Sequence, residues 1–246
     1  MSKKKRPVNR SHSAPPDSKS KTGPEPATVK CRILLVDDHP MTREGLVALV
    51  NRQADLEVCG EASNPAEAMV ALSKCKPDLM VTDMTMPGRS GIEFLKDVHA
   101  MLPALPILVL SMHDEMLYAE RALRAGARGY LMKDAGAVKV VEAIRLVMMG
   151  RAYVSPQMSA RLVDVMTGRR PRGSHSPIEA LSDREFEVFQ LLGSGQSTKE
   201  VAQALHLSSK TVDVHRAHIK QKLHLKDAPS LIHHAVRWVE TQGAQS

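Results

Sequence analysis

The stretch RILLVDD, residues 32–38, decides the fold, because a short apolar run ends there on two adjacent aspartates. Similar runs recur as LMVTD at residues 79–83, ILVLS at 107–111 and GYLMK at 129–133. Each of these also ends on a polar or charged side chain. Continuous apolar runs of this length, separated by helical patterns, are typical of strands buried on both faces of a parallel sheet.

Helical patterns fill the gaps between these runs up to about residue 154. Asn64-Pro65 followed by Glu67 indicates a helix start, with an N-cap, a proline in the first turn and a capping acid. Five strand–helix units predict an α/β, doubly wound, flavodoxin-like fold whose five-stranded parallel sheet has the order 2-1-3-4-5. Strands are predicted at residues 32–36, 56–60, 79–83, 106–110 and 128–132, and helices near residues 41–53, 65–74, 91–101, 115–125 and 136–149.

The aspartates that end the first and third strands are predicted to form one site. The expected strand order places these two strands side by side, and ligands of such sheets bind beyond the carboxyl ends of the strands. Asp37, Asp38 and Asp83 should therefore converge. Clustered carboxylates repel one another unless a cation lies among them, and oxygen ligands of this kind suit Mg²⁺.

The same residues favour phosphoryl chemistry. A carboxylate can attack phosphorus and form an acyl phosphate, and Asp83 is the better candidate because Asp37 and Asp38 look like metal ligands. Lys133 would pair with the phosphoryl oxygens, and Ser111 would hydrogen-bond one of them. Singly, these residues are as well explained by helix caps, a loop hydroxyl and a surface charge. Their joint placement at four strand ends favours a real site.

Charge and cysteine content narrow the class of protein. The net charge is +7, and residues 1–30, rich in Lys, Ser and Pro, carry eight basic and two acidic side chains. This arm is predicted to be disordered, as a solubilising extension or a nonspecific DNA contact. Three widely spaced cysteines without a CxxC pair argue against disulfides and zinc. No run is long enough to span a membrane, so a cytoplasmic protein is expected.

The C-terminal part is predicted to be a small all-helical domain. A linker rich in Pro, Arg and Gly at residues 168–177 follows a short helix near 156–167. Ser182 with Glu185 and Ser197 with Glu200 form two capping boxes, and each begins a short amphipathic helix. A third helix begins near residues 208–209, and a fourth follows it.

The third of these helices has the pattern of a DNA-reading helix. Val212, Ile219 and Leu223 form an apolar stripe with His215 between them, whereas the remaining faces carry basic and small side chains. His215 is interpreted as structural, and the acid at 213 would repel a DNA phosphate. The predicted DNA contacts are Lys210, Arg216, Lys220 and Lys222 with phosphates, Thr211 with a phosphate, Val214 with a thymine methyl and Asp213 with a cytosine amine.

The segments VDDHP at residues 36–40, TDMTMPG at 82–88 and GYLMKD at 129–134 resemble the receiver domain of bacterial two-component response regulators. The resemblance covers about residues 31–152. His39 is interpreted only as a residue that begins a helix. The roles that the resemblance implies are Asp83 as acceptor from a kinase phosphohistidine, Asp38, Asp83 and the Thr85 carbonyl as Mg²⁺ ligands, Asp37 as an accessory acid, and Ser111 and Tyr130 as the switch hydroxyl and switch aromatic.

The C-terminal segments LSDREFEVFQLLGSG at residues 181–195 and KEVAQAL at 199–205, with the helix that follows, resemble the helix-turn-helix domain of LuxR-type regulators. A receiver joined to this domain defines the NarL and FixJ subfamily. The resemblance implies four segments: an arm at residues 1–30, a receiver at 31–152, a linker with a short helix at 153–178 and a DNA-binding domain at 179–243.

These resemblances imply a response regulator rather than an enzyme with a substrate of its own. A histidine kinase would phosphorylate Asp83, Tyr130 would turn inward, and a linker that allows masked and open arrangements would free or dimerise the DNA-binding domain. Double-stranded DNA, a second copy of the chain and RNA polymerase are the expected partners. Two alternatives remain: a constitutive DNA-binding regulator with an unphosphorylated receiver, and a phosphotransferase that uses an aspartyl phosphate. The second needs an acid where this chain has Thr85.

Overall fold

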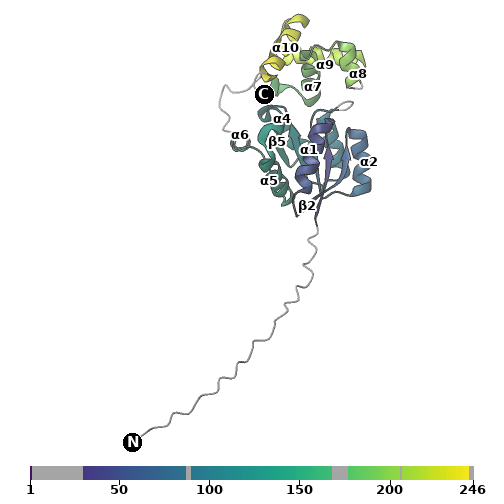
Figure 1. The fold of residues 1–246 in the computed structure, drawn as a ribbon. Coiled ribbons are helices and arrows are strands. Elements are labelled where there is room, and N and C mark those ends of the chain that lie inside the picture. Colours follow the sequence, from purple (N-terminus) through teal and green to yellow (C-terminus); the bar gives the residue numbers. More distant parts are fainter. Residues whose placement is uncertain (2–29, 87–89, 168–176, 206, 244–246) are drawn as a thin grey trace.

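The structure is a computed structural model that describes residues 1, 30–86, 90–167, 177–205 and 207–243. The basic arm and most of the linker that the sequence predicts therefore lie outside the described residues. The described part contains an N-terminal α/β body and a smaller C-terminal helical body (Figure 1). Among the helices described, none is both long enough and apolar enough to cross a membrane.

The α/β body is built on a parallel five-stranded sheet with the order β2-β1-β3-β4-β5. The predicted order is therefore confirmed. The central strands β1, β3 and β4 are almost wholly buried, as their continuous apolar runs require. The strands are β1 (Cys31–Val36), β2 (Leu56–Ala62), β3 (Leu79–Asp83), β4 (Ile107–Ser111) and β5 (Gly129–Met132).

Helices cover both faces of this sheet (Figure 1). Apolar side chains of α1 and α5 pack on one face, and those of α2, α3 and α4 pack on the other. Asn64 caps α2 by accepting a hydrogen bond from the Glu67 amide, as the sequence predicts. The helices are α1 (Pro40–Asn51), α2 (Pro65–Cys75), α3 (Gly91–Met101), α4 (Glu115–Arg124) and α5 (Ala137–Met148), with a short 3-10 helix η1 (Lys133–Ala135) after β5.

A further helix, α6 (Pro156–Met166), begins where the sequence predicts a short helix and packs on α4. The Ser155 amide donates a hydrogen bond to Glu115 Oε1 at 2.7 Å, and Met158 is fully buried. This helix is therefore fixed to the receiver.

The C-terminal body is all-helical, as predicted. Its helices α7 and α8 each begin with the expected capping box, at Ser182 with Glu185 and at Ser197 with Glu200. Helix α7 packs against α9 and α10, and α8 packs against α9. The elements are η2 (Pro177–Ala180), α7 (Asp183–Gly193), α8 (Thr198–Ala204), α9 (Ser209–Lys222) and α10 (Ala228–Gly243).

Candidate phosphoryl-transfer site and DNA-reading helix

The carboxyl ends of β1 and β3 bring the acidic residues together. Asp37 is 2% exposed and Asp83 is 5% exposed, whereas Asp38 is partly exposed beside them. Ligand atoms of Asp37, Asp38, His39 and Asp83 lie within 4.8 Å of one another. The convergence follows from the adjacency of β1 and β3, which places residues about 45 positions apart at the same edge.

Lys133, the first residue after β5, joins this cluster. Its Nζ lies 2.7 Å from Asp37 Oδ2 and 2.8 Å from Asp83 Oδ2. Burial of the ammonium opposes its charge, but the hydrogen bonds that it donates to the two carboxylates outweigh this and raise the pKa of Lys133. The lysine therefore stays charged and offsets part of the negative charge of the site.

Backbone amides fix the orientation of Asp83. Its Oδ1 accepts hydrogen bonds from the amides of Met84, at 2.6 Å, and Thr85, at 3.2 Å, and its Oδ2 accepts from Lys133. The carboxylate is thus held between the start of the β3–α3 loop and an ammonium. This is the arrangement expected of a nucleophile that must keep one geometry.

The residues present fit a hard divalent cation. Asp38 Oδ1 is buried and accepts no hydrogen bond, although His39 Nδ1 lies 2.9 Å away. An unsatisfied buried carboxylate oxygen is costly, and a cation coordinated there would satisfy it. His39 is the N-cap residue of α1 but makes no side-chain cap hydrogen bond, so its place at the helix start agrees with the sequence-based interpretation.

The two residues predicted to form a switch, Ser111 and Tyr130, lie on the paired strands β4 and β5. Ser111 is fully buried, and its Oγ accepts a hydrogen bond from the His113 amide at 3.1 Å. The Tyr130 ring is also fully buried, and its hydroxyl donates to the His113 carbonyl at 2.8 Å. Tyr130 thus points inward in this structure. Its ring fills the core beneath α4, which accounts for this orientation.

His113 is a residue of the site rim that sequence reasoning missed. Its Nε2 lies 2.6 Å from Thr85 Oγ1, and its ring stacks on Tyr118 with centroids 4.6 Å apart. Burial lowers the pKa of His113, so the neutral imidazole is favoured. The sequence signal that could have revealed His113 is its position two residues after Ser111, because this position lies in the loop at the same edge of the sheet.

In the helical body, α9 has the two faces predicted for it. Val212 and Ile219 are fully buried and Leu223 is 8% exposed, so the apolar stripe faces the domain core. His215 is half-buried, and its Nδ1 has no hydrogen-bond partner. On the opposite side Val214 is 47% exposed, and Lys210 and Asp213 are also exposed. The outer face is therefore open to solvent in this arrangement.

Some of the predicted DNA contacts already have protein partners. Arg216 donates to Thr198 Oγ1 at 2.6 Å and to Asp213 at 3.2 Å, so the acid at 213 is offset by a neighbouring cation. Lys222 Nζ lies 2.6 Å from Glu185 Oε2. This ion pair joins the end of α9 to the start of α7, so Lys222 stabilises the domain in addition to any role at DNA.

The pair between Glu185 and Lys222 makes stability depend on pH. Burial opposes ionisation of Glu185, but hydrogen bonds from Lys222 and Ser182 outweigh it and hold the pKa below the ordinary 4.5. A depressed folded-state pKa contributes stability that is present above pH 4.5 and is lost as the pH falls through the folded value.

Glu185→Gln is therefore expected to reduce the stability of this domain at pH 7 by about 2 kcal/mol, because a hydrogen bond to a charged group is lost. The difference from the wild-type chain should shrink as the pH falls below about 4.5. Urea unfolding monitored by Trp238 fluorescence measures this difference in the free energy of unfolding. A difference that did not change between pH 7 and pH 4 would contradict the assignment.

Comparison with known proteins identifies the family. Residues 33–145 match the response regulator receiver domain, and residues 179–235 match the bacterial regulatory proteins of the luxR family. The oxygen regulatory protein NreC of Staphylococcus carnosus is 36% identical over 210 residues, which cover 84% of this chain and 97% of the relative. The chain therefore belongs to the two-component response regulators that join a receiver to a LuxR-type DNA-binding domain. It is a transcription regulator rather than an enzyme of the ordinary kind.

Solved structures share the fold. A LuxR-family response regulator from Aurantimonas is 35% identical, with a TM-score of 0.52, and the match covers 56% of this chain and 99% of that one. RcsB of Salmonella enterica serovar Typhimurium, bound to promoter DNA in the presence of a phosphomimetic, has a TM-score of 0.65 at 23% identity, covering 84% and 98% of the two chains.

Proposed function

We propose that Asp83 is the residue at which this response regulator is phosphorylated. The observation that carries the proposal is the placement of Asp83 between the Lys133 ammonium, 2.8 Å away, and the partly exposed Asp38. An Asp83 oxygen attacks the phosphorus of a kinase phosphohistidine, the P–N bond breaks, and the imidazole leaves with a proton. Lys133 balances the added charge, and Ser111 donates a hydrogen bond to a phosphoryl oxygen.

Asp38, Asp83 and the Thr85 carbonyl would hold Mg²⁺, with Asp37 as an accessory acid. The cation would offset the charge of the transferring phosphoryl group. The unsatisfied Asp38 Oδ1 supports this role. In this proposal the receiver catalyses only its own phosphorylation and dephosphorylation.

Phosphorylation then controls DNA binding by the helical domain, in a cytoplasmic regulator. The phosphoryl group adds about −2 charge at the strand ends and biases the receiver toward a state in which two chains pair. Two copies of α9 then address two half-sites about one helical turn apart, where RNA polymerase can be recruited. Ser111 and Tyr130 transmit the change, because both lie between the acids and α4.

A direct test combines phosphorylation and DNA retention. The full chain is incubated with a phosphorylated kinase domain or acetyl phosphate, with Mg²⁺ or with a chelator. The expected result is a phosphoryl adduct on the peptide that contains Asp83, formed only with Mg²⁺, and tighter retention of promoter fragments. DNA binding that is equal with and without the adduct would favour the constitutive regulator instead.

Lys210 is expected to contact a DNA phosphate. It lies in the first turn of α9, where the helix dipole disfavours a positive charge, so its position is better explained by DNA than by stability. Lys210→Ala should weaken binding to all DNA sequences alike and lower the slope of log affinity against log salt by about 1.

The matched control is Lys74→Ala, which removes an exposed lysine from α2 of the receiver. Salt titrations of DNA binding by fluorescence anisotropy compare the two variants. An unchanged slope in Lys210→Ala would remove this residue from the interface.

A further inference from the structure

The helical domain lies over the carboxyl-end edge of the receiver sheet, with α7 facing the receiver (Figure 1). Between the two bodies is a cavity of about 420 Å³. Its receiver side includes Asp38, His39 and Thr85 of the phosphoryl-transfer site, and its other side includes Gln190 and Leu205 of the helical domain. The helical domain is thus a roof above the site.

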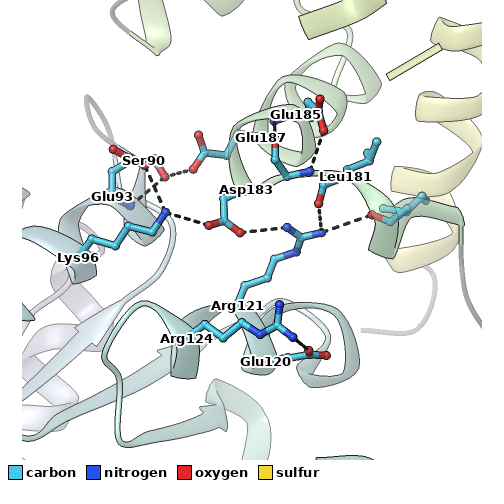
Figure 2. Close-up of polar contacts among 12 residues, drawn as sticks. Ser90, Glu93, Lys96, Glu120, Arg121, Arg124, Leu181, Asp183, Glu185 and Glu187 are labelled. Atoms are coloured by element: carbon cyan, nitrogen blue, oxygen red, sulfur yellow. Dashed lines mark hydrogen bonds and ion pairs between the residues drawn. The ribbon is translucent and has the colours of Figure 1, made fainter. Parts of the chain in front are cut away.

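A charged latch, defined here as Lys96, Arg121 and Asp183, holds this roof. Asp183, the first residue of α7, accepts from Lys96 at 2.9 Å and from Arg121 at 3.0 Å (Figure 2). Both cations lie on the receiver, on α3 and α4. Burial opposes ionisation of Asp183, but these hydrogen bonds outweigh it and lower its pKa. The latch is therefore charged at neutral pH.

Arg121 also binds the chain that leads into α7. It donates to the carbonyl of Leu181 at 2.8 Å (Figure 2). It also donates to the carbonyl of Ile178 at 3.3 Å. Its guanidinium lies 4.6 Å from the centre of the Phe186 ring. One half-buried arginine thus satisfies a carboxylate, two carbonyls and an aromatic face of the other domain, which makes it the centre of the docking contact.

Two further contacts lie between the latch and the phosphoryl-transfer site. Gln190 of α7 hydrogen-bonds the Tyr118 hydroxyl of α4, and Ser90 at the start of α3 hydrogen-bonds Glu187. Tyr118 also packs edge-on against Phe186, with ring centroids 5.0 Å apart. The roof is therefore attached along one side of the cavity by polar and aromatic contacts together.

Docking leaves the outer face of α9 accessible. Lys210, Asp213 and Val214 are exposed while α7 contacts the receiver. In the described part of the chain, the surface that docking covers most directly is thus the approach to Asp83 rather than the DNA-reading face. This differs from a masked arrangement in which the receiver hides the reading helix.

The size of the cavity separates two kinds of phosphoryl donor. A helix with its side chains is about 10–12 Å wide, and the helical domain occupies the space above Asp38 and Thr85 that such a helix would need. A phosphohistidine on a kinase helix brings several turns with it and does not fit beneath the roof. The cavity is lined by Asp38, Met84 and Thr85 around Asp83, and the His39 side chain, 64% exposed, marks an open rim through which a donor as small as a phosphorylated imidazole could enter.

We infer that the docked helical domain acts as a size filter on the phosphoryl donor, so that a protein phosphohistidine reaches Asp83 only after the latch opens, whereas a small phosphoimidazole reaches it in the docked chain. The inference rests on the proposed role of Asp83. In both cases the Asp83 oxygen forms the new P–O bond, the P–N bond of the donor breaks, and the imidazole leaves with a proton. The two donors share this chemistry and differ in size.

Kinase binding and docking of the helical domain are thermodynamically coupled. Because kinase binding and docking exclude each other, a bound kinase stabilises the undocked chain by the same free energy with which docking weakens kinase binding. The kinase thereby separates the domains in the same step in which it gains access to Asp83.

The test compares Arg121→Gln and Asp183→Asn, which break the latch from opposite domains, with the wild-type chain. The donors are phosphoimidazole and the phosphorylated cytoplasmic domain of a histidine kinase chosen because it phosphorylates the wild-type chain. Intact-mass spectrometry follows the adduct with Mg²⁺ present throughout. We expect transfer from the kinase domain to become about tenfold faster in both variants, equivalent to about 1.4 kcal/mol. Transfer from phosphoimidazole should be unchanged.

Arg124→Gln is the matched control. Arg124 lies one turn after Arg121 on the same helix, is exposed, and pairs with Glu120 of its own helix (Figure 2). It should behave as the wild-type chain with both donors, and circular dichroism checks that all variants are folded. Equal acceleration with both donors, or no acceleration with the kinase domain in either latch variant, would overturn the inference. An adduct that maps to a peptide without Asp83 would instead refute the proposed role of Asp83.

Discussion

Asp83→Asn is expected to reduce phosphorylation of the chain to background with every donor. The amide oxygen of asparagine carries no negative charge and is a poor nucleophile, so no acyl phosphate forms. The side chain keeps its shape, and the Met84 amide can still donate to it, so the fold should persist. Intact-mass spectrometry after incubation with donor and Mg²⁺ measures the loss. Promoter binding should no longer respond to the donor.

Asp78→Asn is the control for this experiment. Asp78 immediately precedes β3, at the opposite edge of the sheet, and is exposed, with its carboxylate accepting a hydrogen bond from the Arg32 amide at 2.9 Å. The Asp78→Asn chain should be phosphorylated on Asp83 as fully as the wild-type chain. A stable adduct in the Asp83→Asn chain would show that another residue accepts the phosphoryl group.

Gly91→Ala is expected to cost about 3 kcal/mol or more of receiver stability, at the upper end of overpacking penalties. A Cβ at this position would lie 2.0 Å from the Met84 carbonyl oxygen and 2.8 Å from its carbon. Both are backbone atoms, so either α3 or the loop after β3 must move. That loop carries Thr85, and phosphorylation of Asp83 should therefore slow as well. Urea unfolding followed by circular dichroism measures the first effect, and the adduct rate measures the second.

Gly45→Ala provides the opposite case within the same domain. Gly45 lies inside α1, and nothing lies within 4 Å of an added Cβ. Alanine there should stabilise the receiver by about 0.5–1 kcal/mol, because glycine is unfavourable in a helix interior. If Gly91→Ala unfolded at the same urea concentration as the wild-type chain, the close approach of α3 to Met84 would not matter in solution.

The sheet could be predicted because its sequence signal is local. Except for β2, each strand is a short, mostly buried run that ends at or just before a polar residue, so topology alone places Asp37 and Asp83 at one edge. The same logic predicts Lys133 there, since β5 ends at that edge. The predicted helix starts also agree with the observed ones, because capping side chains act within three residues of the helix they begin.

The contact between the domains could not be predicted, because it depends on their relative orientation. Asp183 meets residues 87 and 62 positions earlier in the chain, and no periodicity links them. The ion pair between Lys222 and Glu185 could not be predicted for a related reason. A lysine near the end of a DNA-reading helix suggests phosphate, but the packing of α7 against α9 brings Glu185 to it. Tyr130 points inward because its ring fills the core, which a motif does not reveal.

Trp238, the single tryptophan of the chain, packs edge-on against Phe186 at 5.5 Å and Phe189 at 5.7 Å. Phe186 in turn touches Tyr118 and Arg121 of the receiver. One ring thus separates the indole from the surface where the two bodies meet. The molecule therefore carries its own optical probe, whose emission is expected to change when the bodies separate, without any attached dye.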